Sequence, residues 1–207
     1  MKKFDLNANN QPQTYAIGIK ELWEIKPENH TAGKIVHTTG WPLNTDTYGG
    51  SFLYHFDKNL VSIGFVIGLD YKNPNIDPHH ELQLLKTHPW LKNILDGAEM
   101  LAYGSKTLPE GGLYSIPELC VDGAMLIGDS AGFLNGQRLK GIHLAMKSGM
   151  FAAQVASSAL ADDDLSGNRL KQYEELWKKE FPPYNKILKG KTALYKLSES
   201  ELSFMGR

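Results

Sequence analysis

Cysteine is almost absent from this chain, because Cys120 is the only one among its 207 residues. An internal disulfide needs two cysteines, and thiolate zinc or iron–sulfur sites need several, so the chain forms none of these from its own thiols. An excess of charge is missing too, since 22 Lys and Arg balance 23 Asp and Glu. A net charge of −1 gives no field that would attract nucleic acid, and we expect no nucleic-acid partner.

Long apolar runs are also missing. No stretch reaches the ~18 apolar residues of a membrane-spanning helix, because Lys147 and Gln154 interrupt the best candidate. The N-terminal stretch MKKFDLNANNQPQ has two lysines without an apolar core after them, which does not match a secretory signal. Residues 1–14 are polar and rich in Asn and Gln, which predicts a disordered or truncated start.

The first half of the chain has the apolar and polar alternation that is typical of strands. The pattern predicts strands over residues 16–25, 33–39, 48–56, 60–69 and 100–106. Asp57-Lys58-Asn59 is expected to form the hairpin turn between the third and the fourth strand. Residues 113–116 are expected to pair near the fifth strand, and short helices are predicted over 79–87 and 89–95. These elements predict an α+β fold with a mostly antiparallel sheet and inserted helices.

Strand, tight-turn and helix signals follow one another directly in residues 123–153. The apolar run 124–127 predicts a buried strand, Gly128-Asp129-Ser130 a turn, and residues 145–160 a helix of small residues. A further amphipathic helix is predicted over 169–180, with an apolar stripe of Leu170, Tyr173, Leu176 and Trp177. A strand that ends in Gly-Asp and leads toward a helix is a place where a ligand can meet the backbone.

The side chains and backbone of this turn suit a sugar or a phosphate. An ionised Asp129 accepts hydrogen bonds from sugar hydroxyls, and Gly128 and Gly132 allow close approach of the backbone. A helix that begins near Gly141 would direct free N–H groups and a partial positive charge, worth ~0.3–1 kcal/mol, at an anion. An ordinary strand-to-helix turn has the same pattern, so the residues alone leave both interpretations open.

Other residues with ligand chemistry have simpler structural interpretations. No carboxylate or cysteine completes a metal site with His79, His80 and His88, so we expect no metal here. Cys120 is expected to be a small buried hydrophobe, because no histidine with an orienting acid is evident around it. The stripe in 169–180 is expected to pack in the core, with membrane contact as a second interpretation, and the apolar hairpin 52–69 is a similar membrane candidate.

Residues 128–153 contain the segments GDSAGFLN and RLKGIHLAMKSGMFAA. They resemble the second FAD-contacting motif of electron-transfer flavoprotein:ubiquinone oxidoreductases. The segments HTTGWPLNTDTYGGSFLYHF, GFVIGLDYKNPNIDPHHELQLLKTHP and AYGSKTLPEGGLYSIPEL are similar to the same family, in the same order and spacing. The resemblance covers about residues 15–181. It implies a flavoenzyme at a membrane surface that takes electrons from reduced electron-transfer flavoprotein and passes them to ubiquinone.

The resemblance also implies a division of the chain. Residues 15–120 resemble the ubiquinone-binding domain. Residues 121–181 resemble the C-terminal part of a glutathione-reductase-like FAD domain, with its closing strand and helix. Residues 182–207 would form a tail that leads toward an iron–sulfur domain.

Site residues carried over from the family fall in two places. The quinone contact falls on Gly49 and Gly50, where a flat ring could approach the backbone. The FAD contacts fall on Gly128, Asp129, Ser130, Gly132, Lys140, Gly141, Ile142 and His143. The family often has Thr where Ile142 stands, so a side-chain hydrogen bond is not expected there. No catalytic acid, base or metal ligand is implied, because flavin and quinone exchange the electrons and the protein positions them.

Two parts of the family pattern are missing from the chain. It has no G-x-G-x-x-G strand-turn-helix, which would hold the adenosine pyrophosphate, and no four-cysteine [4Fe-4S] segment. We therefore expect the middle portion of such an enzyme, with half of an FAD site, weak or no flavin binding alone, and no activity alone. The alternatives are a non-catalytic quinone- or membrane-binding module that needs a separate nucleotide-binding chain, and a geranylgeranyl-reductase-like flavoprotein. The expected location is peripheral, on the cytoplasmic face of a bacterial inner membrane or on the mitochondrial inner membrane of a eukaryote.

Overall fold

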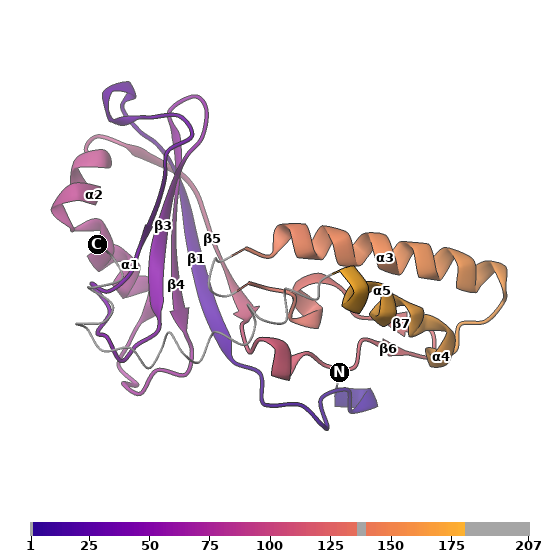
Figure 1. Ribbon diagram of the computed structural model, residues 1–207. Coiled ribbons are helices and arrows are strands. Elements are labelled where there is room, and N and C mark those ends of the chain that lie inside the picture. The colour runs from indigo at the N-terminus through magenta and orange to yellow at the C-terminus, as the bar shows by residue number, and fades with distance from the viewer. Residues whose placement is uncertain (1, 136–139, 181–207) are drawn as a thin grey trace. The chain divides into compact units, whose positions relative to one another are not determined.

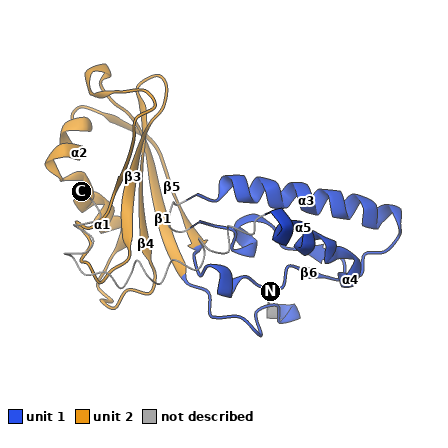
Figure 2. Ribbon diagram, viewed as in Figure 1, with its two compact units in different colours: residues 1–14, 109–197 blue, residues 15–108, 198–207 orange. Residues whose placement is uncertain are grey.

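The computed structural model describes residues 2–135 and 140–180. The described chain forms two compact units, coloured separately in Figure 2. One holds residues 15–108 and contains most of the strands, and the other holds residues 2–14 together with the described residues from 109 onward. The predicted tail 182–207 lies outside the described residues.

The strand-rich unit is built on a five-stranded sheet with the order β2-β3-β4-β1-β5 (Figure 1). The strands are β1 (Tyr15–Glu24), β2 (Ile35–Thr38), β3 (Gly49–His55), β4 (Leu60–Gly68) and β5 (Glu99–Pro109). The β1–β4, β2–β3 and β3–β4 pairs are antiparallel. This confirms the mostly antiparallel sheet and the hairpin, in which Lys58 (φ 58°) and Asn59 (φ 60°) take the left-handed conformation of a tight two-residue turn.

Two short helices pack on one face of this sheet. Helix α1 (Pro78–Lys86) begins after Asp77, whose carboxylate accepts the backbone N–H groups of His79 and His80, and helix α2 (Pro89–Ile94) follows. Their leucines form a core with alternate residues of the sheet: Leu82, Leu85 and Leu91 with Leu53, Val61, Ile63, Phe65 and Ile67. Most apolar side chains of the hairpin 52–69 therefore lie in the core, whereas Phe56 and Leu69 are exposed.

The second unit consists of short strands and helices. It contains the two-stranded pair β6 (Cys120–Val121) and β7 (Ala124–Met125), the 3₁₀ turn η4 (Gly128–Ala131), and the helices α3 (Ile142–Ala161), α4 (Gly167–Leu170) and α5 (Gln172–Glu180). The strand predicted over 124–127 is thus only two residues long, because η4 starts immediately after Ile127. Helix α3 extends beyond the predicted 145–160 at both ends, and its cap is Gly141 as expected.

Residues 113–116 do not form the strand that was expected there. Gly112 has a left-handed φ of 75°, and Leu113–Ser115 form a 3₁₀ helix, η3. The Ser115 N–H bonds back to the Gly112 carbonyl at 3.1 Å, so this backbone is used within the turn rather than in a ladder.

The apolar stripe of the last predicted helix packs in the core, as expected. Leu170, Tyr173 and Trp177 are buried, and Trp177 stacks on Phe133 with ring centroids 3.6 Å apart. The predicted continuous helix is divided at Lys171 into α4 and α5.

The polar N-terminal segment was expected to be disordered or truncated, but it is bonded to the second unit. The Asn10 side chain donates to Ile116 O at 2.7 Å, and the Gln11 N–H donates to Tyr114 O at 2.9 Å. Leu6 is buried and its carbonyl accepts the Glu118 N–H at 3.0 Å. Polar composition did not predict this order, because the partners are backbone groups about a hundred residues away.

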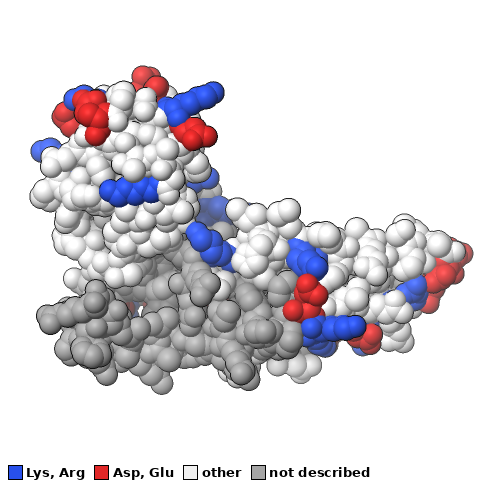
Figure 3. Space-filling view, turned by 45° about the horizontal axis from the view of Figure 1, so that its top comes forward, with Lys and Arg blue, Asp and Glu red and all other residues white. Residues whose placement is uncertain are grey.

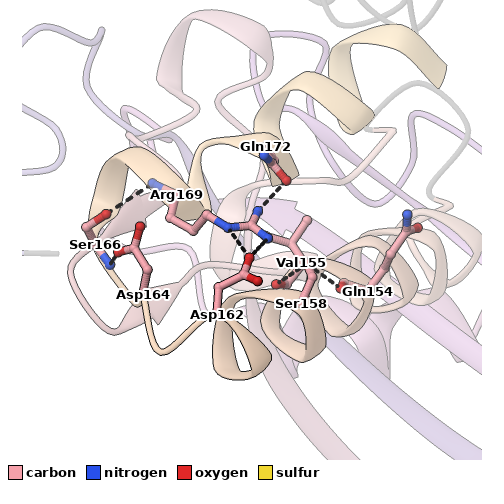
Figure 4. Close-up of polar contacts among 8 residues, drawn as sticks. All are labelled: Gln154, Val155, Ser158, Asp162, Asp164, Ser166, Arg169 and Gln172. Atoms are coloured by element: carbon pink, nitrogen blue, oxygen red, sulfur yellow. Dashed lines mark hydrogen bonds and ion pairs between the residues drawn. The ribbon is translucent and has the colours of Figure 1, made fainter.

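The acidic loop after α3 is a bonded turn (Figure 4). Arg169 donates two hydrogen bonds to Asp162 Oδ2, at 3.2 and 2.7 Å, and Asp164 accepts the Ser166 N–H at 2.9 Å. The Ser166 hydroxyl in turn accepts the Arg169 N–H at 3.3 Å and caps α4. These carboxylates join α3 to α4 and need no ligand to explain them.

Candidate functional site

The glycines of the predicted ligand-facing turn have backbone reasons to be glycine. Gly128 (φ 57°) and Gly132 (φ 79°) both lie in the left-handed region that L side chains rarely adopt. A Cβ on Gly128 would lie 3.2 Å from the Ala145 side chain, so the turn passes close against α3. The structure therefore confirms a tight turn against the helix, and both glycines are buried.

Two buried hydroxyl groups fix the chain on either side of Ile127. The Ser148 hydroxyl, on α3, accepts the Gly128 N–H at 3.0 Å and donates to Ala145 O at 2.9 Å. The Tyr173 hydroxyl, on α5, donates to Leu126 O at 3.0 Å. Burial is the main reason that the pKa of Tyr173 lies above its ordinary value. Sequence reasoning missed Ser148 and the hydrogen bond of the Tyr173 hydroxyl, although a serine on the apolar face of a predicted helix was a signal.

Asp129 and Gly141 come together although twelve positions separate them in the sequence. Asn135 and Lys140 exchange backbone hydrogen bonds of 3.0 and 3.2 Å, which closes the intervening loop and returns the chain to the turn. A Cβ on Gly141 would lie 3.2 Å from Asp129 Oδ1 and 2.9 Å from Leu134. The carboxylate of Asp129 therefore lies against the backbone at the start of α3.

The start of α3 offers hydrogen-bond donors beside that carboxylate. Gly141 provides no side-chain cap for the first N–H groups of α3. The neighbouring positions Ser130, Lys140, Ile142 and His143 are exposed, and Asp129 is half-buried. The arrangement places one acceptor and several donors at one exposed spot, and these can bind a polyhydroxyl or anionic group.

Gly49 and Gly50 lie in the other unit, at the start of β3. A Cβ on Gly49 would run into the side chain of Leu43 and lie 2.5 Å from Val66 O. A Cβ on Gly50 would collide with the backbone carbonyl of Thr38 on β2. Packing of the sheet thus requires both glycines, and the quinone contact there stays a prediction.

Cys120 is unsuited to nucleophilic chemistry. The residue is 5% exposed, and its thiol donates to Leu170 O at 3.3 Å. Burial, together with the nearby Glu174 carboxylate, raises the pKa of Cys120 to about 11. This confirms the interpretation as a small buried hydrophobe.

Residues 2–135 and 140–180 contain neither a cluster of metal-ligating side chains nor a helix that could span a membrane. Within that part of the chain, no three His, Cys, Asp or Glu side chains come together as a metal site would need. None of the described helices has the length and apolar character to cross a membrane.

The chain is similar in sequence to proteins of one family. Residues 15–108 match the family model described as ETF-QO, ubiquinone-binding. A probable mitochondrial electron transfer flavoprotein-ubiquinone oxidoreductase of Saccharomyces cerevisiae is 51% identical over 154 residues, and the human mitochondrial protein of that name is 48% identical over 180. The matches cover 74% and 84% of this chain, and they confirm the resemblance that the sequence motifs indicated.

The chain is much shorter than these relatives. It spans 24% of the length of the yeast protein and 29% of the human one. Among solved structures, a geranylgeranyl bacteriochlorophyll reductase-like protein from Thermoplasma acidophilum has a TM-score of 0.72 and 20% identity. That likeness covers 97% of this chain and 47% of the other, and it shows a shared fold.

Proposed function

We propose that this chain, which its sequence matches place in the electron transfer flavoprotein-ubiquinone oxidoreductase family, forms the quinone-binding part and one side of the flavin site of such an enzyme. In this proposal, electrons pass from reduced electron-transfer flavoprotein through FAD to ubiquinone. The observation that carries it is the sequence identity to two such oxidoreductases, 51% over 154 residues and 48% over 180.

The residues of the second unit fit one side of a bound FAD. Asp129 is half-buried against Gly141, where a side chain on residue 141 would fill the space, and the start of α3 has donors without a side-chain cap. Asp129 would accept hydrogen bonds from the sugar hydroxyls next to the flavin ring, and the first N–H groups of α3 would donate to an electron-rich ring oxygen. FAD, when bound, supplies the redox chemistry, and these groups of the chain bind and orient it. Ile142 is 79% exposed, and its side chain brings no polar group to this site.

The same fit does not extend to an iron–sulfur cluster. A [4Fe-4S] centre is held by four cysteine thiolates, and this chain has one cysteine, which is buried. The relatives are named as mitochondrial proteins. We propose that this chain lies peripherally at a membrane, because ubiquinone is lipid-soluble and is found there.

The test is a protein in which this chain replaces its counterpart. In what we call the grafted protein, the 154 matching residues of the yeast relative are exchanged for the corresponding residues of this chain. We expect the grafted protein to purify with FAD and to reduce ubiquinone-1 with electrons from reduced electron-transfer flavoprotein. A grafted protein that is folded and holds FAD but does not reduce ubiquinone-1 would contradict the proposed function. It would then favour a flavoprotein that acts on another substrate.

Two substitutions test the flavin side of the site. Asp129→Ala removes the proposed acceptor for these sugar hydroxyls, so we expect the grafted protein to lose FAD on gel filtration. Asp163→Ala, at an exposed acid in the loop after α3, is the matched control and should keep it. Ile142→Thr adds a hydroxyl at the start of α3 and should tighten FAD binding. Equal FAD content in Asp129→Ala and Asp163→Ala would refute the role given to Asp129.

A further inference from the structure

Helix α5 has an aromatic inner side and a charged outer side. Tyr173 is 0% and Trp177 is 6% exposed, whereas Glu175, Lys178 and Lys179 are exposed. Figure 3 shows acidic and basic side chains intermixed on the surface of this unit, at the right of the view. A charged outer side is usual for a surface helix, so the contacts that distinguish α5 are those of Tyr173 and Trp177.

These two aromatic residues hold the chain on both sides of Asp129. Before it in the sequence, the Tyr173 hydroxyl donates to Leu126 O at 3.0 Å. After it, the Trp177 ring stacks on the Phe133 ring, with centroids 3.6 Å apart and an angle of 15° between the ring planes. Phe133 is 0% exposed, so this contact lies in the core. One helix therefore contacts both ends of the short segment that contains the Asp129 carboxylate, although none of the predicted FAD contacts lies on that helix.

Helix α5 is itself bonded to the elements around this segment. Near its start, Glu174 Oε1 accepts the N–H of Leu119, directly before β6, at 3.2 Å. The Leu119 carbonyl accepts the Leu126 N–H at 2.8 Å, so the same strand pair is joined to α5 twice. At the end of α5, a Glu180 carboxylate oxygen lies 3.1 Å from Lys147 Nζ on α3. These bonds give α5 a fixed position from which its tyrosine can hold the turn.

We infer that Tyr173 is a positioning residue of the flavin site, because its hydroxyl holds Leu126 and so sets the place of the turn that contains Asp129. The inference rests on the proposed function, which makes this turn one side of a bound FAD. Tyr173 acts through the backbone of residues 126–129 and not by contact with FAD, since it is fully buried. Its ring fills the core, so the hydroxyl can be removed without leaving a cavity.

The experiment needs a protein that holds FAD and contains residue 173 of this chain. The human relative matches 84% of the 207 residues, and a match of that length includes Tyr173. In what we call the human graft, its 180 matching residues are exchanged for the corresponding residues of this chain. Tyr173→Phe in this graft removes only the hydroxyl. We expect about a tenfold loss of FAD affinity, as for a lost buried hydrogen bond, and a shift of the visible absorption band of the bound flavin.

Two controls separate positioning from a loss of stability. Val155→Ala, at a 2% exposed position, removes two buried methyl groups from the same unit and should lower the thermal midpoint. Residue 155 lies about 20 Å along α3 from its first residue, Ile142, so FAD affinity and the absorption band should stay unchanged. Tyr114→Phe, at a 52% exposed position, is the matched loss of a tyrosine hydroxyl and should alter none of these values. Equal FAD affinity in Tyr173→Phe and Val155→Ala would overturn the inference.

The outcomes also separate this inference from the proposed function. If the human graft reduces ubiquinone-1 and Tyr173→Phe keeps full FAD affinity, the inference is wrong and the proposed function stands. If the graft holds FAD without reducing ubiquinone-1, but Tyr173→Phe lowers FAD affinity, the inference stands and the function fails. In the 207-residue chain alone, Tyr173→Phe should increase the hydrogen-exchange rates of the Leu126 and Gly128 amides. Unchanged rates there would overturn the inference without reference to FAD.

Discussion

Glu21 is a buried carboxylate on β1, and its side chain is 4% exposed. Lys86, at the end of α1, donates to its two oxygens at 2.8 and 2.9 Å, and the Trp23 indole N–H donates at 2.8 Å. The Lys86 ammonium also lies 5.1 Å from the centroid of the Trp23 ring. This ion pair ties α1 to the sheet, so we expect Lys86→Met to leave a buried negative charge with one remaining donor.

The structure sets the size of the effect. Removing one partner of a buried ion pair costs ~3–5 kcal/mol of unfolding free energy. The Lys86 side chain is 14% exposed, so water can partly reach the site, and we expect a loss of about 3 kcal/mol. Glu21→Leu combined with Lys86→Met removes both charges and leaves only the Trp23 N–H without its acceptor. The unfolding free energy of that double variant should lie within about 1–2 kcal/mol of that of the original chain.

Urea unfolding of the original chain, of Glu21→Leu, of Lys86→Met and of the double variant measures both values, with hydrogen exchange of the β1 amides as the probe of this unit. Lys26→Met is the matched control, because it breaks an ion pair of the same 2.8 Å length whose side chains are 42% and 75% exposed. We expect no measurable change there. A loss below about 1 kcal/mol in Lys86→Met, or an equal loss in the single and double variants, would refute the reasoning.

Three further predictions concern other buried positions. Gly50→Ala places a Cβ against a backbone carbonyl of β2 and should lower the unfolding free energy, measured in urea, by about 1–3 kcal/mol. Gly104→Ala is the control, because a Cβ there meets no atom within 4 Å, and it should change that free energy by less than about 0.5 kcal/mol. Cys120 should react with a thiol reagent at pH 8 only after denaturation, because it is buried with a raised pKa; rapid labelling of the folded chain would contradict this. Burial lowers the pKa of His55 below its ordinary value, so protonation favours the unfolded chain. Stability should be complete above about pH 6.5 and fall as the pH drops below it, and His55→Asn should flatten this slope.

The sheet unit was predictable because its signals are local. The turn Asp57-Lys58-Asn59 lies between two β-branched and aromatic runs, and its left-handed residues are the ones that such a hairpin needs. Asp77 before Pro78 likewise marks the start of α1, and its carboxylate caps the helix, which begins one residue before the predicted start at residue 79. In these places a few neighbouring residues determine the geometry.

The second unit was harder to predict because distant partners decide its backbone. Residues 124–127 have a strand pattern, yet the chain turns at Gly128, where the N–H bonds to Ser148 twenty positions away. Residues 2–14 look disordered by composition, yet their amides bond to residues beyond 110. In the candidate site, the family motif indicated Asp129 and Gly141 separately, but their contact depends on the Asn135–Lys140 pairing.

Ser148 gives a direct test of whether α3 shapes the turn that contains Asp129. Ser148→Ala leaves the buried Gly128 N–H without its acceptor, which lowers the unfolding free energy by about 1–3 kcal/mol. The higher helix propensity of alanine offsets about 0.5 kcal/mol of this loss. Ser158 is the matched control on the same helix, because its hydroxyl donates only to Gln154 O and Val155 O at the exposed end of α3 (Figure 4). Ser158→Ala should therefore be neutral or slightly stabilising. Ser148→Ala should increase the hydrogen-exchange rate of the Gly128 amide and leave the α3 amides protected. If both variants behave alike, the helix does not hold the turn through this hydroxyl, and the position of Asp129 must be set by the Asn135–Lys140 pairing instead.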